Sequence, residues 1–121
     1  MDVIKTAIFD CWIIKPKVFK DDRGYFYESF QQESFQQLTK TLFSPIQDNE
    51  AFSTYGVIRG LHFQETPFAQ AKLVRSLQGS VLDVAVDLRK DSPSYGKVVT
   101  QVLSQENKEQ LFVPKGCAHG Y

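Results

Sequence analysis

The 121-residue sequence has no excess of either charge, because 14 lysines and arginines balance 14 aspartates and glutamates. This balance argues against a nucleic acid or an anionic membrane held by bulk electrostatics, although a few basic side chains can still bind one small anion in a pocket. The sequence also lacks an apolar run long enough for a signal peptide or a membrane span, and Asp2 and Asp10 interrupt its N-terminal stretch. We therefore expect a cytoplasmic protein that binds neither nucleic acid nor membrane.

Cysteine and histidine are scarce, with only Cys11, Cys117, His62 and His119. Two distant cysteines in a cytoplasmic chain are interpreted as reduced, separately packed thiols. The four residues show none of the paired spacings that zinc ligands use, so we expect no metal site. No repeat, low-complexity stretch or linker divides the sequence, and its length predicts a single domain over residues 1–121.

Aromatic residues are plentiful, with ten phenylalanines, five tyrosines and one tryptophan, and these residues favour strands. Short alternating stretches between turn residues predict an all-β sandwich or barrel. The predicted strands are one or two over 4–14 and single strands over 25–30, 46–49, 56–64, 71–77, 80–88, 97–103 and 110–113. Gln78-Gly79 predicts a tight hairpin between two of them. One short helix is predicted over 31–41, where Phe35, Leu38 and Leu42 recur at helical spacing.

The stretch 59–64 is the densest in residues that can do chemistry. Because side chains alternate along a strand, Gly60, His62 and Gln64 are predicted to share one face, and Gly60 leaves room there for a ligand. On the next strand Lys72 shares a face with Val74. A lysine within an apolar run either extends to solvent at the strand end or faces a negative group, since an unpaired buried charge is costly.

These two residue types suit proton abstraction next to a carbonyl. Such a carbon acid needs a base whose pKa lies near the working pH, and histidine supplies one. The enolate oxygen needs a nearby positive charge, and inversion needs an acid that returns the proton to the opposite face. His62 and Lys72 can fill the first two roles.

Each of these residues also has an ordinary structural interpretation. A single strand histidine is more often a hydrogen-bonded structural residue than a catalyst, and a single lysine usually lies on the surface. Arg23, Arg59 and Arg89 would usually be solvated or ion-paired. Asp83 and Asp87 alternate with Ala85, which predicts either a polar pocket wall or an exposed face. The residues alone predict a β-barrel that can hold a polar site in its interior.

Six motifs follow one another along the sequence: FKDDRGYFYE at 19–28, QDN at 47–49, RGLHFQ at 59–64, QAKLV at 70–74, GSVLDVAVDLR at 79–89 and AHGY at 118–121. In this order they resemble the dTDP-4-dehydrorhamnose 3,5-epimerase family. The resemblance implies a cupin-like jelly-roll barrel of antiparallel strands that is usually dimeric and needs no cofactor. It also implies no metal, because metal-binding cupins carry a His-x-His strand where this sequence has His62-Phe63-Gln64.

The resemblance further implies a substrate, a reaction and a set of site residues. The substrate would be dTDP-4-dehydro-6-deoxyglucose, epimerised at C3 and C5 to dTDP-4-dehydro-L-rhamnose. His62 would be the base and Lys72 would stabilise the enolate. The residues expected to bind the nucleotide sugar are Arg23, Glu28, Gln47, Asp48, Asn49, Arg59, Gln64 and His119.

Several alternatives stay open at this point. A C3-only epimerase, a 3,4-ketoisomerase and a non-catalytic nucleotide-sugar-binding domain would share these motifs. Family members continue beyond the Ala-His-Gly motif and bring a general-acid tyrosine, later strands and an acidic partner for the histidine. We expect this chain to lack that C-terminal part, since Tyr121 does not align with the acid.

Overall fold

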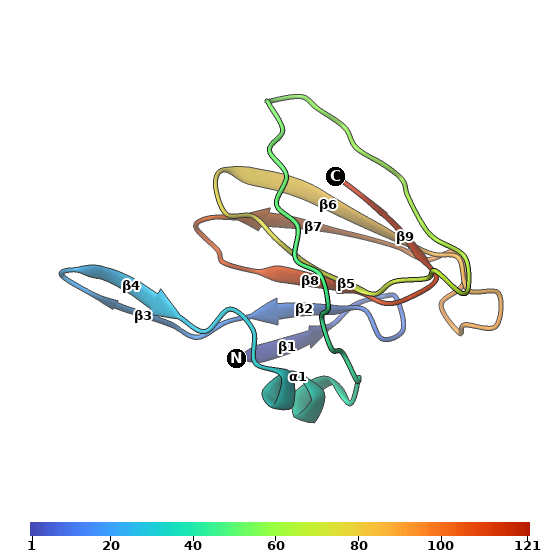
Figure 1. Cartoon of the computed structure of the whole chain (residues 1–121), viewed down its shortest axis with the longest axis horizontal. Coiled ribbons are helices and arrows are strands. Elements are labelled where there is room, and N and C mark those ends of the chain that lie inside the picture. The colour runs from blue at the N-terminus through green and yellow to red at the C-terminus, as the bar shows by residue number, and fades with distance from the viewer.

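The computed structural model describes residues 1–121 and contains nine strands and one short helix, which confirms the predicted all-β class. Two antiparallel sheets lie face to face (Figure 1). The four-stranded sheet has the order β1 (Asp2–Lys5), β2 (Trp12–Lys15), β8 (Gln110–Val113), β5 (Lys72–Arg75). The three-stranded sheet has the order β7 (Val98–Ser104), β6 (Ser80–Asp87), β9 (Cys117–Gly120). No helix combines the length and the apolar character that crossing a membrane requires.

The main core fills the space between the two sheets. Alternate residues of a strand point to the same side, so Leu111 and Val113 of β8 meet Ala85 of β6 and Leu103 of β7, all at most 1% exposed. Phe112, between the two β8 residues, points to the opposite face of its sheet. The inward side of each strand is therefore defined by these core residues.

The helix α1 (Gln32–Thr39) covers the outer face of the four-stranded sheet (Figure 1). Gln31 caps its first turn by accepting a hydrogen bond from the Ser34 amide, and Lys40 ends it in the left-handed conformation. Its Phe35 ring lies 5.0 Å from the ring of Phe112, centroid to centroid. The predicted helix is confirmed, but Leu38 is 45% exposed and the buried positions are Phe35 and Thr39.

A hairpin of β3 (Val18–Asp21) and β4 (Gly24–Tyr27) projects from the sheets (Figure 1). Phe19 and Phe26 on it are 54% and 70% exposed. Two cations connect it to the rest of the chain. Lys108 lies 4.2 Å from the Tyr25 ring centroid and donates to its hydroxyl at 2.9 Å, and Arg75 donates to the Tyr27 hydroxyl at 3.3 Å.

Three predicted features of the strand pattern are wrong. Residues 46–49 and 56–64 form no strands, and the chain between α1 and β5 is irregular except for one antiparallel bridge between His62 and His119. A strand persists only where another strand takes up its hydrogen bonds, and the neighbouring strands leave most of this segment unpaired. Gln78-Gly79 makes no hairpin, because β5 pairs with β8 and β6 pairs with β7 and β9. The strands β3 and β9 were not predicted.

Candidate active site

His62 and His119 are held together by two backbone hydrogen bonds. The His62 amide donates to the His119 carbonyl at 2.8 Å, and the His119 amide donates to the His62 carbonyl at 2.9 Å. Residues paired in this way carry their side chains on the same face, with β-carbons about 5 Å apart. His119 is in turn the cross-strand partner of Ala85, which is 0% exposed in the core. The face that His62 and His119 share is therefore the inward one.

Lys72 lies on the inward face of the opposite sheet. It is the cross-strand partner of Val113, a core residue, and Val74 of the same strand packs against that core. The Lys72 side chain is half-buried and forms no ion pair with any carboxylate. An inward ammonium without an acidic partner is suited to an anionic oxygen of a ligand.

A β-bulge brings Arg59 to the same face as His62. Arg59 and Tyr121 exchange two backbone hydrogen bonds, at 2.6 and 2.8 Å, so that Gly60 and Leu61 together lie opposite Gly120 alone. Two residues against one is the arrangement of a bulge. Tyr121 and His119 are two residues apart and share a face, so their partners Arg59 and His62 share it too. Regular alternation would have put Arg59 on the opposite face.

Gly60 and Gly120 pack directly against each other at this bulge. A β-carbon on Gly60 would lie 2.7 Å from the Gly120 α-carbon, and one on Gly120 would lie 2.5 Å from the Arg59 carbonyl oxygen. Gly60 also has a φ of +131°, which side chains rarely allow. The prediction that Gly60 leaves room for a ligand is therefore wrong, because the neighbouring backbone occupies that room.

The Arg59 guanidinium is oriented by the segment before it. Its Nε donates to the Ser53 hydroxyl at 3.0 Å and one Nη donates to the Phe52 carbonyl at 3.0 Å. The Ser53 hydroxyl also lies 3.2 Å from the Tyr121 hydroxyl. A guanidinium has five N–H groups, so Arg59 keeps donors for an anionic ligand.

The His119 ring is paired with Asp83, a contact that the sequence pattern did not reveal. The distance from Nε2 of His119 to Oδ1 of Asp83 is 2.8 Å, and the two side chains are 10% and 0% exposed. The other carboxylate oxygen of Asp83 is buried without a hydrogen-bond partner. Alternation with Ala85 was the only signal, and it left Asp83 as either a pocket wall or an exposed residue.

Several residues predicted to bind the nucleotide sugar lie apart from this cluster. Gln47, Asp48 and Asn49 are exposed on the irregular segment, where the Gln47 amide donates to the Asn49 side chain at 3.1 Å. Arg23 lies at the hairpin tip with its side chain 90% exposed and bonds to Asp21 at 2.6 Å. Glu28 lines a cavity of about 240 Å3 at the base of that hairpin. Within one chain, the structure does not bring these residues to His62.

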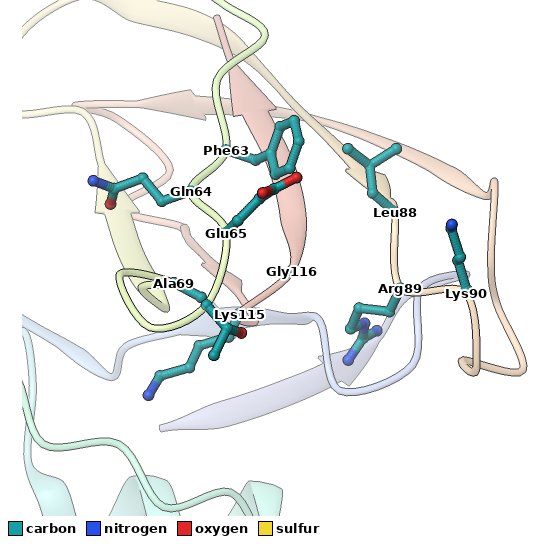
Figure 2. A pocket seen from close by; sticks show the side chains of 10 residues that line it. Phe63, Gln64, Glu65, Ala69, Leu88, Arg89, Lys90, Lys115 and Gly116 are labelled. Atoms are coloured by element: carbon teal, nitrogen blue, oxygen red, sulfur yellow. The ribbon is translucent and has the colours of Figure 1, made fainter.

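Gln64 lines a different and larger cavity, of about 450 Å3 (Figure 2). Figure 2 shows the Phe63 and Gln64 side chains leaving the chain on opposite sides, with Arg89 and Lys115 across from them. The prediction that Gln64 lies beside His62 on an inward strand face is not supported, because residues 63–64 are outside any strand.

Arg89, which also lines this cavity, belongs to an ion network around the buried Asp87. It donates to Asp87 from Nε at 2.8 Å and from Nη2 at 2.9 Å, and the hydroxyls of Ser92 and Ser94 each donate to Asp87 at 2.6 Å. Burial alone would raise the pKa of Asp87, but the hydrogen bonds from Arg89, Ser92 and Ser94 outweigh it and hold that pKa well below its usual range. No group of three or more histidine, cysteine, aspartate or glutamate side chains is arranged to hold a metal ion.

Comparison with known proteins identifies the family to which this arrangement belongs. Residues 5–121 match the sequence profile of dTDP-4-dehydrorhamnose 3,5-epimerase. The chain belongs to the dTDP-4-dehydrorhamnose 3,5-epimerase family. It is 54% identical to the Shigella flexneri enzyme and 53% identical to the Escherichia coli K12 enzyme, over all 121 residues. The chain spans about two thirds of the length of these relatives, 67% of the first and 65% of the second.

Solved structures of family members have the same fold. A crystal structure of dTDP-4-dehydrorhamnose 3,5-epimerase from Elizabethkingia anophelis superposes with a TM-score of 0.95 at 52% identity, covering 99% of this chain and 66% of that one. The Legionella pneumophila dTDP-6-deoxy-D-glucose-3,5-epimerase, in complex with dTDP-4-keto-L-rhamnose, superposes with a TM-score of 0.91 at 47% identity, covering 98% of this chain and 63% of that one. These likenesses confirm the predicted cupin-like jelly roll.

Proposed function

We propose that this protein epimerises dTDP-4-dehydro-6-deoxyglucose at C3 and C5, giving dTDP-4-dehydro-L-rhamnose. The observation that supports this proposal most strongly is the backbone bridge that sets the exposed His62 beside His119 of β9, with Lys72 on the inward face of the opposite sheet. The names of the family relatives point to the same reaction. We expect the reaction to need no cofactor and no metal ion.

In the proposed mechanism, His62 removes the proton from a carbon next to the C4 ketone. The electron pair of that C–H bond moves into the ring, and the negative charge collects on the C4 oxygen as an enolate. The Lys72 ammonium, which has no carboxylate partner, stabilises that oxygen. Inversion then requires an acid on the opposite face of the sugar to return a proton to that carbon as the ketone re-forms, and no residue among 1–121 is assigned to that role.

The remaining residues divide between the two ends of the substrate. Arg59 has a guanidinium suited to phosphate oxygens and lies on the same face as His62, so we assign it to the diphosphate. His119 lies next to His62 and contacts the sugar. Gln47, Asp48, Asn49 and Gln64 remain predicted contacts to the nucleotide.

We also propose that residues 1–121 act as one domain within a homodimer. The projecting hairpin exposes Phe19, Tyr25 and Phe26, and large apolar patches on a surface are typical of protein contacts. A hairpin that docks on a second copy would carry Arg23 and Glu28 toward that copy's site. The location we propose is the cytoplasm, since Cys11 and Cys117 are unpaired and a reducing compartment keeps thiols in that form.

Solvent exchange tests the proposed reaction directly. The substrate is mixed with protein in heavy water, and proton NMR follows deuterium entering C3 and C5. We expect both positions to exchange in the wild type and neither in His62→Asn, which should still bind dTDP. His119→Asn is the matched control, since it changes the neighbouring histidine of the same face. It should weaken binding of the sugar nucleotide, but not of dTDP, more than it slows exchange.

Other outcomes select the alternatives. Exchange at C3 alone would indicate a C3-only epimerase, and migration of the ketone would indicate a 3,4-ketoisomerase. Tight binding of dTDP without exchange at either carbon would indicate a nucleotide-sugar-binding domain and would refute the proposed epimerase activity.

A further inference from the structure

We propose that Asp83 is a positioning residue, which holds His119 in one tautomer so that its Nδ1 accepts a hydrogen bond from a hydroxyl of the bound sugar. The Asp83 contact fixes the tautomer of His119 whatever the ligand is, and only the identity of that ligand rests on the proposed function. Its basis is the pairing of two inward side chains from neighbouring strands.

The register explains how the pair forms. His119 of β9 lies opposite Ala85 of β6, and Asp83 is two residues along β6 on the same face. Such a diagonal neighbour is within reach of a long side chain. The His119 Nε2 and the Asp83 Oδ1 are 2.8 Å apart. The contact therefore follows from the strand pairing itself.

The chemistry of the two groups fixes where the ring hydrogen lies. An ionised carboxylate only accepts hydrogen bonds, so Nε2 of His119 must carry the hydrogen that it donates to Asp83. Nδ1 of a neutral ring is then an acceptor. The His119 ring makes no second hydrogen bond within the chain, and its side chain is 10% exposed. The remaining acceptor is therefore open to a ligand on the face shared with His62.

The position of Asp83 argues against a purely structural role. Asp83 is 0% exposed, and its neighbours on the same face of β6 are the apolar Val81 and Ala85. Its Oδ2 is buried without a hydrogen-bond partner. An unsatisfied buried acceptor destabilises the fold, and an apolar side chain of similar volume is often neutral or stabilising at such a position. A carboxylate kept under these conditions is best explained by what it does to His119.

Asp83→Asn is a sharp test because asparagine has nearly the same shape. Its amide can donate to Nε2, which moves the ring hydrogen of His119 to Nδ1 and turns the ligand-facing acceptor into a donor. The same exchange leaves the wrong histidine tautomer in serine-protease triads. Nitrogen-15 NMR of the ring, at a pH where the imidazole is neutral, should show Nε2–H in the wild type and Nδ1–H in Asp83→Asn. Asp87→Asn is the matched control: it changes another buried carboxylate on the same face of β6 and should lower stability without changing the His119 tautomer.

Binding measurements then connect the tautomer to the ligand. The probes are dTDP and dTDP-6-deoxy-D-glucose, which has no ketone and cannot react. We expect Asp83→Asn to lower the affinity for dTDP-6-deoxy-D-glucose about tenfold and to leave the affinity for dTDP unchanged, because only the sugar hydroxyl loses its acceptor. His119→Asn should show the same selective loss, and the double variant should lose no more than either single variant.

Each outcome decides the inference. The inference is overturned if the His119 ring of the wild type carries its hydrogen on Nδ1. It is also overturned if Asp83→Asn lowers the affinity for both probes equally, or for neither. If Asp83→Asn does not fold, the wild-type spectrum and the selectivity of His119→Asn still decide. A wild type that passes these tests but shows no deuterium exchange refutes the epimerase activity and leaves the role of Asp83 intact.

Discussion

Alanine at position 120 would put a β-carbon 2.5 Å from the Arg59 carbonyl oxygen and 3.0 Å from the Gly60 α-carbon. Both are backbone atoms, so the two backbone segments would have to separate by about 1 Å to restore ordinary van der Waals contact. The Arg59–Tyr121 hydrogen bonds, now 2.6 and 2.8 Å, would then exceed normal length. Crowding and the loss of these bonds together should lower the free energy of unfolding by about 3 kcal/mol.

Urea denaturation of three alanine variants separates contact from backbone conformation. Gly24 has a φ of +135°, close to the +131° of Gly60, but a β-carbon there would meet nothing within 4 Å. Gly24→Ala therefore measures the conformational cost alone, about 1–2 kcal/mol, whereas Gly60→Ala should combine that cost with the crowding. Gly120→Ala should also weaken dTDP binding, because Arg59 would move with its backbone segment. A loss below about 0.5 kcal/mol for Gly120→Ala, within the range of ordinary surface substitutions, would refute the close contact at the bulge.

Three further predictions concern the buried network, the thiols and the proposed reaction. Asp87→Asn should lower the free energy of unfolding by about 3 kcal/mol at neutral pH. The folded pKa of Asp87 lies below its unfolded value, so the ionised carboxylate stabilises the fold above about pH 4. Urea melts should therefore show the full difference between variant and wild type above about pH 4, and this difference should disappear as the pH falls through the folded pKa. Burial raises the pKa of Cys11 to about 11 and that of Cys117 to about 12. Ellman's reagent at pH 8 should therefore label neither thiol in the native protein and both after unfolding. Rapid labelling of the native protein would contradict the burial of the thiols. Lys72→Met should slow deuterium exchange about 100-fold with dTDP affinity unchanged; a loss of dTDP affinity without slower exchange would instead assign Lys72 to the nucleotide.

Alternation and turn residues were sufficient to predict the helix and most of the paired strands, but not β3 and β9, which also have partners within the chain. The strands β6, β7 and β8 and the helix α1 lie within a few residues of their predicted positions, and Lys72 shares a face with Val74 as predicted. That this face points inward was not predicted; it follows from the pairing of Lys72 with the core residue Val113. Local spacing failed to predict which strands pair where the partner strands are distant in sequence. The partner of β5 is β8, and nothing local to Gln78-Gly79 reveals that pairing.

The site was only partly predictable for a related reason. His62 was predicted on a strand face with Gly60 and Gln64, but it lies outside the strands, in a single bridge to His119. The face of Arg59 depends on a bulge whose two sides come from residues 59–62 and 119–121. Gly60 and Gly120 are the only sequence feature that indicates this bulge, and they indicate it only once the two backbone segments are known to pair. The Asp83–His119 contact likewise needs the register of β6 against β9, which no pattern within either strand contains.

The segment that carries His62 has one further consequence. Between residues 44 and 70, the backbone is joined to the rest of the chain by four hydrogen bonds, all to His119 and Tyr121. Breaking four such bonds requires far less free energy than opening the sheets, so this segment can detach in a sub-global opening while the core stays folded. The amide of His62 should then exchange with solvent faster than that of Leu111, and ligands that bridge Arg59 and His119 should slow it. Assembly of the site is thus a separate equilibrium from folding of the barrel.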